Sequence, residues 1–150
     1  MTVRDLVLKH EGLKLFPYTD SVGKKTIGVG HCLDVSPLPA DYYEPDGSIS
    51  EATAMEVFDE DLDKATASCL KLTEPWWLSL NEPRQAALID MCFNLGETGL
   101  AGFAHMLGCL SAGNWVSAGA AAMQSKWAQQ VPDRALEDAV MLRTGRWPGE

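Results

Sequence analysis

The chain contains no long apolar run of the kind that crosses a membrane. No stretch of about 18 consecutive apolar residues occurs in the sequence. The opening residues MTVRDLVLKHEG also lack the apolar block of a signal peptide, because Arg4, Asp5 and Lys9 interrupt them. We therefore expect neither insertion into a membrane nor export through a cleavable leader.

Cysteine is scarce, and its spacing excludes the common cysteine motifs. The four cysteines form no CxxC pair and have no histidine at metal-binding spacing; they are Cys32, Cys69, Cys92 and Cys109. Cys69 and Cys92 fall on apolar helical faces, where a free cysteine packs as a small hydrophobic side chain. A disulfide framework is the less favoured alternative. We predict four reduced thiols and no cofactor.

No stretch of the sequence has the pattern of a metal site. Residues 59–63 (DEDLD) concentrate acidic side chains, but they lack the glycine and the distal glutamate of a calcium loop. The segment also falls in a predicted helix, where successive carboxylates point in different directions. We therefore predict no bound metal.

Positive charge is missing from one block of the chain. Between Asp34 and Asp63 there are ten acidic residues and no lysine or arginine, and this block accounts for the net charge of −9. The residues before it carry a small excess of basic side chains, and the residues after it are close to neutral. Such a block is more often a solvated face than a binding surface, and we expect no nucleic-acid partner.

The bulk composition is typical of one globular domain. Hydrophobic residues make up 46% of the sequence and charged residues 22%, which is ordinary for a folded protein in water. A chain of 150 residues is close to the usual size of a single domain with one substantial core. We therefore treat residues 1–150 as one domain.

The first fifty residues predict a short helix followed by a β-hairpin. Thr2 and Asp5 have the spacing of a capping box, and the apolar residues after them share one helical face until Gly12. Strand-forming residues then occupy two runs within residues 14–32, separated by a polar turn. Residues 33–49 are rich in proline, aspartate and glycine, and predict an irregular loop.

The rest of the chain is predicted to be helical. Ser50 is a good N-cap for the longest amphipathic pattern, which covers residues 51–72. Asn81 can cap a second helix, and its segment from Ala86 to Leu95 is apolar on nearly every side, which is typical of a helix inside a bundle. Glycines and prolines then divide the remaining residues into short helices.

These patterns predict an α+β, mostly helical fold of two lobes. A small lobe over about residues 13–50 would contain the β-hairpin, and the helix over about 51–72 would link it to the rest. The larger, all-helical lobe would cover about residues 73–150, with residues 1–12 packing on it. A cleft is expected where the two lobes meet.

Three polar side chains at the junction of the first helix and the hairpin form a candidate catalytic group. Glu11 closes the helix, Asp20 occupies the hairpin turn and Thr26 begins the return strand. Hydrolysis of a glycosidic bond needs a protonated carboxyl at the leaving oxygen and a group that directs water or a nucleophile at the sugar carbon. The spacing alone is more typical of caps and turns than of catalysis.

Ordered motifs along the chain resemble those of the phage-type lysozymes, the family of the T-even phage endolysin. Residues 10–12 (HEG), 18–20 (YTD) and 26–31 (TIGVGH) are similar to the active-site signature of that family. The resemblance continues at residues 94–103 (NLGETGLAGF), 125–127 (SKW), 132–135 (PDRA) and 143–147 (RTGRW). It spans nearly the whole chain and implies a lysozyme-like fold.

The resemblance implies a role for each of the three candidates. Glu11 matches the general acid, and Asp20 matches the second carboxylate, which stabilises the developing oxocarbenium charge or orients water. Thr26 matches the hydroxyl that holds the attacking water. The family inverts at the anomeric carbon, which predicts carboxyl groups of Glu11 and Asp20 about 6.5–9.5 Å apart.

Arg134 matches an arginine that contacts the catalytic glutamate from the helical lobe. A neighbouring cation lowers the pKa of a carboxyl, whereas a general acid needs its pKa raised. Burial must therefore offset the effect of Arg134 on Glu11, or the acid works from a minority of protonated molecules.

The resemblance also implies an ion pair and a set of substrate contacts. His31 matches a histidine that pairs with Asp61 on the linking helix, so we predict a structural ion pair with a raised His31 pKa. Four further positions match sugar-contacting residues of the T-even enzyme: Phe93, Cys32, Met106 and Ala121. Only Phe93 keeps the family's chemistry, and the substrate contacts are therefore expected to differ.

The function implied by the resemblance is that of an endolysin. It would hydrolyse the β-1,4 bond between N-acetylmuramic acid and N-acetylglucosamine in bacterial peptidoglycan, during phage or prophage lysis. The protein would be a monomer, remain in the host cytoplasm and reach the periplasmic wall through a holin. The alternatives are a lytic transglycosylase acting on the same bond and a catalytically silent peptidoglycan-binding module.

Overall fold

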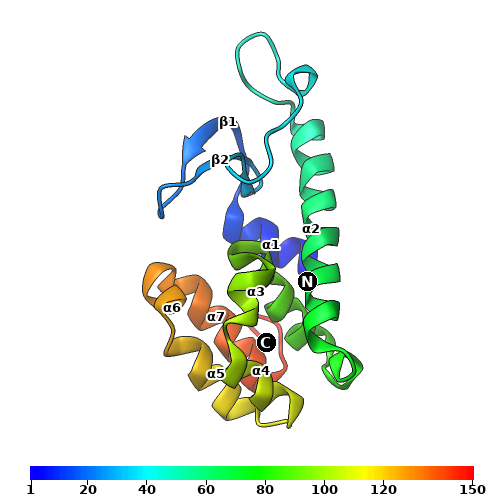
Figure 1. Ribbon diagram of the computed structural model, residues 1–150, viewed down its shortest axis with the longest axis vertical. Coiled ribbons are helices and arrows are strands. Elements are labelled where there is room, and N and C mark those ends of the chain that lie inside the picture. The colour runs from blue at the N-terminus through cyan, green and yellow to red at the C-terminus, as the bar shows by residue number, and fades with distance from the viewer.

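The computed structural model describes all 150 residues. Its main elements are seven α-helices and one three-stranded sheet. The elements are α1 (Val3–Glu11), β1 (Lys14–Thr19), β2 (Lys25–Gly28), β3 (His31–Cys32), α2 (Glu51–Thr73), α3 (Glu82–Ala101), α4 (Ala104–Ser111), α5 (Trp115–Met123), α6 (Lys126–Gln130) and α7 (Pro132–Thr144). The sheet lies at one end, α3–α7 form a bundle at the other, and α2 runs along one side (Figure 1). This is the mostly helical α+β fold that the sequence predicts.

Helix α1 begins and ends where the sequence predicts. The Thr2 hydroxyl accepts a hydrogen bond from the Asp5 backbone N–H at 3.2 Å, and the Asp5 carboxylate accepts one from the Thr2 N–H at 2.9 Å. Leu6 and Val7 are fully buried in the main core, and each such side chain contributes about 1.5–3 kcal/mol. Capping and burial together hold the C-terminal residue of α1, Glu11, in one place.

The predicted hairpin is present and gains a third strand. Strands β1 and β2 pair antiparallel, with Tyr18 opposite Thr26. β2 then pairs with β3, which places Ile27 opposite His31. The sequence did not predict β3, because a strand of two residues carries no alternation of its own and depends on the tight turn before it. This turn brings His31 back toward the hairpin.

Helix α2 connects the two ends of the molecule. The Ser50 hydroxyl caps it by accepting a hydrogen bond from the Thr53 N–H at 3.1 Å. In the first half of α2, Phe58 is fully buried and packs edge-to-face against Phe93 of α3 with the ring centroids 5.7 Å apart. This aromatic pair anchors α2 to the bundle.

Two separate cores are present. The larger contains 27 buried residues, drawn mainly from the α-helices, with Val29 just after β2 and Trp77 and Leu80 between α2 and α3. The smaller consists of Ile27, Ile49 and Ala54 between the sheet, the loop and α2. Leu13 packs against both cores at the point where α1 leads into the sheet. None of the helices is both long and apolar enough to span a membrane.

Helix α3 is longer than the sequence predicts and is kinked at Gly96. Asn81 caps it as predicted, by accepting a hydrogen bond from the Arg84 N–H at 3.2 Å. The backbone leaves the helical conformation at Gly96, with φ 78° and ψ 170°, and a second helical stretch follows the kink and continues to Ala101. Gly96 lies at the kink and faces the cleft described next.

Candidate active site

A cleft of about 340 Å³ lies between the sheet, α2 and α3. All three predicted catalytic side chains, Glu11, Asp20 and Thr26, line this cleft. The opposite wall comes from α2 and from the kinked part of α3, including Phe93 and Glu97. The end of α1 and the hairpin therefore bring together residues that the sequence separates by up to fifteen positions.

Glu11 reaches the cleft from the last turn of α1. Its side chain is 13% exposed, and Gly12 ends the helix immediately after it. The carboxyl lies directly over Gly30, where a Cβ atom would collide with it, and Gly30 has a positive φ of 64°. Glycine is thus required at position 30 both for the backbone and for the space that Glu11 occupies.

Two opposing effects act on the Glu11 proton. Burial raises the pKa of Glu11, whereas the Arg134 guanidinium, 2.6 Å from its carboxyl, lowers it. Burial prevails, and the pKa of Glu11 lies above its ordinary value. This answers the question left open by the sequence, because a raised pKa is what a general acid needs.

Asp20 shapes the turn between β1 and β2. Its Oδ1 atom accepts hydrogen bonds from the backbone N–H groups of Val22 at 3.0 Å and Lys24 at 2.8 Å. Both bonds use the same oxygen, so Oδ2 remains for another donor. The carboxylate is therefore held in place by the turn while it faces the cleft.

Thr26 is nearly buried at the start of β2. It is 4% exposed, and its hydroxyl donates to the backbone carbonyl of Lys24 at 3.0 Å. Since the hydroxyl proton is already committed, its lone pairs are left to accept a hydrogen bond from a water molecule in the cleft. The side chain has no charge to titrate.

Arg134 makes the contact with Glu11 that the resemblance implied. From α7 its Nη1 donates to Glu11 at 2.6 Å, and its Nε and Nη2 donate to the two oxygens of Asp90 at 2.8 and 2.9 Å. Arg134 is 9% exposed. The guanidinium is therefore shared between two carboxyls from α1 and α3.

His31 and Asp61 form the expected contact on the cleft wall. His31 Nδ1 lies 2.6 Å from the Asp61 carboxylate, and His31 Nε2 lies 2.6 Å from the carbonyl of Ser36. The hydrogen bond to Asp61 raises the pKa of His31 against the opposing effect of burial. The pair ties β3 to α2 and so helps to fix the width of the cleft.

The predicted substrate contacts divide into two groups. Cys32 and Phe93 line the cleft with the catalytic candidates. Met106 and Ala121 do not: both lie beside a separate cavity bounded by α4, α5 and the end of α3, and Met106 is 1% exposed. Met106 packs into the core because α4 turns its apolar face inward.

The four cysteines are free thiols, as predicted. Cys69 of α2 and Cys92 of α3 are buried and neighbouring, and the contact with Cys92, together with burial, raises the pKa of the Cys69 thiol.

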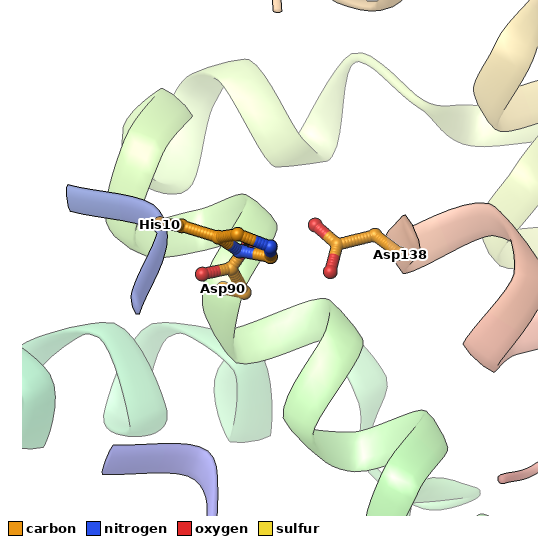
Figure 2. A group of neighbouring side chains, drawn as sticks. All are labelled: His10, Asp90 and Asp138. Atoms are coloured by element: carbon orange, nitrogen blue, oxygen red, sulfur yellow. Dashed lines mark hydrogen bonds and ion pairs between the residues drawn. The ribbon is translucent and has the colours of Figure 1, made fainter. Parts of the chain in front are cut away.

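Three functional candidates, His10, Asp90 and Asp138, were not predicted from the sequence. His10 contacts Asp90 at 2.9 Å and Glu137 at 2.9 Å, and Asp138 is completely buried nearby (Figure 2). Two signals in the sequence could have identified Asp90 and Asp138. Asp90 is the one acidic residue in the apolar segment of α3, and Asp138 stands at an apolar position between Ala135 and Leu142 on α7.

The His10, Asp90 and Asp138 group has the residue types of a metal site. One ligand atom from each lies within 4.8 Å of the others. However, both oxygens of Asp90 already accept hydrogen bonds from Arg134. A divalent cation here would have to displace or approach a buried guanidinium, so the donor set fits a metal poorly.

The fold, the cleft and a buried carboxyl with a raised pKa define a glycosidase of the lysozyme class. The family model described as phage lysozyme matches residues 8–142. The chain belongs to the phage lysozyme family.

Individual relatives agree with this assignment. The chain is 30% identical to the pre-baseplate central spike protein Gp5 of Enterobacteria phage T4, over 97% of this chain, and it spans 28% of the length of that protein. It is 25% identical to probable T4-type lysozyme 1 of Dictyostelium discoideum and 24% identical to probable T4-type lysozyme 2, covering 96% of this chain and 95% of each relative.

Proposed function

We propose that the protein is an inverting muramidase that hydrolyses the β-1,4 bond between N-acetylmuramic acid and N-acetylglucosamine. The observation that carries the proposal is the shared cleft. A buried carboxyl with a raised pKa, Glu11, lines it together with a second carboxyl, Asp20, and a hydroxyl, Thr26. An acid and a water-directing group lining one cavity are what glycoside hydrolysis requires.

Glu11 is the proton donor in this proposal. Its proton passes to the glycosidic oxygen as the bond between that oxygen and the anomeric carbon breaks, and the electron pair of the bond leaves with the oxygen. Glu11 is then a carboxylate, and Arg134 at 2.6 Å stabilises the new charge. Arg134 therefore favours the state of Glu11 that follows proton transfer.

The second half of the reaction adds one water molecule. The water donates a hydrogen bond to Thr26, whose own proton is held by the Lys24 carbonyl. The water oxygen bonds to the anomeric carbon, and its proton passes to Asp20, where Oδ2 is not used by the turn. Attack from the face opposite to the leaving oxygen inverts the configuration.

The water-directing residues favour hydrolysis over transglycosylation. A transglycosylase closes the product ring with the sugar's own hydroxyl and has no use for a held water. Asp20 and Thr26 line the same cleft as Glu11, which supports a mechanism with two groups besides the acid. Their presence also argues against a silent wall-binding module.

We further propose that the biological role is lysis of a bacterial host. In this account the protein is a monomer, remains in the host cytoplasm and acts on periplasmic peptidoglycan after a holin permeabilises the membrane. Family membership and the phage relative support it. Expression in a Gram-negative host should cause lysis when a holin is co-expressed and not without it; equal lysis without a holin would contradict this part of the proposal.

The catalytic proposal is tested by clearing of purified peptidoglycan with matched variants. Glu11→Gln keeps the shape of the side chain but removes the transferable proton, and should lower the rate by about 10²–10⁴. Glu74→Gln makes the same change at an exposed position just after α2, outside the acidic block, and serves as the control. Equal rates for the Glu11→Gln variant and the wild type, with both folded, would overturn the assignment of Glu11.

A further inference from the structure

A buried network of charged side chains lies behind Glu11, on the side away from the cleft. Arg134 is its centre, with Glu11 on one side and both oxygens of Asp90 on the other. Asp90 is 0% exposed and also accepts from His10 at 2.9 Å. How strongly Arg134 acts on Glu11 therefore depends on how much negative charge Asp90 presents to Arg134.

Asp138 adds a second carboxyl to this network. It is fully buried, and neither of its carboxyl oxygens meets an N–H or hydroxyl donor. Figure 2 shows it pointing from α7 toward His10 and Asp90. Its carboxyl and that of Asp90 lie within 4.8 Å. Burial without a donor is costly for a charged carboxylate.

Protonation of one of the two carboxyls removes this cost. Two carboxylates this close and out of contact with water cannot both be ionised, but a carboxylic acid can donate to a carboxylate. Burial and the charge of Asp90 raise the pKa of Asp138. Burial opposes ionisation of Asp90 too, but its bonds to His10 and Arg134 outweigh that effect and lower the pKa of Asp90. The proton therefore belongs to Asp138.

We propose that Asp90 and Asp138 are positioning residues for the proton donor Glu11: Asp138 keeps its proton and donates it to Asp90, and Asp90 holds Arg134 and offsets its charge. The inference rests on the proposed role of Glu11. Without the negative charge of Asp90, the guanidinium would act on Glu11 alone and draw off the proton that catalysis requires.

Other titratable groups also face Glu11 and Asp138. Those that act on Glu11 or face it come from α1, β1, α3 and α7: His10, Tyr18, Asp90 and Arg134. Those along the cleft are Asp20, Lys24, His31, Asp61, Lys64 and Glu97. Asp138 faces His10, Asp90, Arg134 and Glu137. Among these groups, only Asp90 touches Arg134 from the side opposite to Glu11.

The experiment is a carbon-13 NMR titration of the side-chain carboxyls, without substrate. In the wild type, Asp138 should titrate well above the ordinary value of about 3.9, and Glu11 above about 4.3. Asp90→Asn should move the Glu11 titration to lower pH by about 1 unit or more, because an opposite charge has that effect when it is not offset. Asp133→Asn, an exposed acid next to Arg134 in sequence, is the control and should leave Glu11 unchanged.

Variants at Asp138 test where the proton is. The amide of Asp138→Asn can donate to Asp90 as the protonated acid does, so the Glu11 titration should stay near its wild-type position. Asp138→Ala removes the donor and should shift the Glu11 titration away from its wild-type position. The basic limb of the pH–activity profile should move in the same direction as the Glu11 titration in each variant, which a purely structural role would not produce.

Three results would overturn the inference. They are an ordinary titration for Asp138, an unchanged Glu11 titration in Asp90→Asn, and stabilisation by Zn²⁺ in the wild type but not in Asp138→Asn, which would indicate a cation instead of a proton. If Asp90→Asn does not fold, the wild-type titration of Asp138 still decides. The titrations need no activity, so an inactive protein with these shifts would refute the proposed function and leave the network intact.

Discussion

At the scale of single residues, the site depends on the competition between burial and Arg134 for the proton of Glu11. The side chain is 13% exposed, and burial is the larger effect. Gly30 makes this burial possible, because any side chain there would push the carboxyl out of its position. Burial, and not a single hydrogen-bonding partner, is therefore the main cause of the raised pKa of Glu11.

The raised pKa of Glu11 has a consequence for stability. A carboxyl whose pKa is raised in the folded state makes the protein less stable as pH rises. The loss begins at the unfolded pKa of about 4.3 and continues up to the folded pKa. Glu11→Gln removes this loss and can still accept from Arg134. We expect the variant to unfold at higher urea concentration than the wild type at about pH 7, with little difference near pH 4. A less stable variant at neutral pH would contradict the raised pKa.

The ion pair of His31 with Asp61 gives a second pH dependence of stability, this time from a basic group. Its folded pKa is raised by Asp61, so the pair stabilises the protein below about pH 6.5 and this contribution is lost as pH rises through the folded value. His31→Asn should cost about 1.5–3 kcal/mol near pH 5, as for other hydrogen bonds to charged groups, and less near pH 9. NMR titration of His31 at or below about 6.5 would refute the ion pair.

The resemblance of local motifs to a known family identified the catalytic candidates but not the network behind them. Glu11, Asp20 and Thr26 lie within one helix–hairpin unit, so the motifs that carry them are close together in the sequence. His10, Asp90 and Glu137 come from three helices far apart in the chain. Their pairing depends on how α1, α3 and α7 pack, which no local pattern describes. A polar residue at an apolar position was the only available signal.

At the scale of elements, capping residues predicted helix boundaries well. Thr2, Ser50 and Asn81 each cap the helix that was expected to follow. The third strand was not predicted. Glycines were expected to divide the later helices, and the backbone does break at Gly96, but the continuation of α3 beyond that break was not predicted, because it depends on neighbours outside the segment. A two-residue strand needs β2 to pair with it, and α3 continues past Gly96 because the residues beyond it, such as Leu100, are buried in the bundle.

The kink at Gly96 is expected to require glycine. With φ 78° and ψ 170°, the residue lies in a region that only glycine enters readily, and another residue costs about 1–3 kcal/mol there. Gly96→Ala should therefore lower the free energy of unfolding by that amount and reduce wall clearing, since the kink lines the cleft.

Gly108 supplies the matched control for this substitution. It lies on the exposed side of α4, and an added Cβ would meet no atom within 4 Å. Gly108→Ala should stabilise the protein by about 0.5–1 kcal/mol, because alanine favours helix. If Gly96→Ala and Gly108→Ala changed the free energy of unfolding equally in a urea titration, the backbone at the kink would not require glycine.

At the scale of the whole molecule, the net charge of −9 is concentrated on one exposed region. Of the ten acidic residues between Asp34 and Asp63, nine are exposed, and Asp61 is the partly buried exception that pairs with His31. The block is therefore a solvated face around the loop and the first half of α2, as its composition indicates. It makes no positive surface for an anionic wall polymer.

This charge predicts an unusual response to salt. Repulsion between the acidic face and anionic wall polymers is screened over about 10 Å at 0.1 M salt, so wall clearing should stay constant or rise as salt is added. Glu56→Gln combined with Glu60→Gln, two exposed changes on α2, should weaken any rise. A steep fall in activity with salt, as for a cationic enzyme, would contradict the account.

The most direct test of the central claim is the mass of the fragments released from purified peptidoglycan. A proton from Glu11 and a water held near Thr26 and Asp20 should give fragments with a free reducing end, each heavier by one water than the corresponding anhydro product. Glu11→Gln should release almost none. Mass spectra dominated by anhydro fragments would show that no water attacks in this cleft, and would contradict the mechanism.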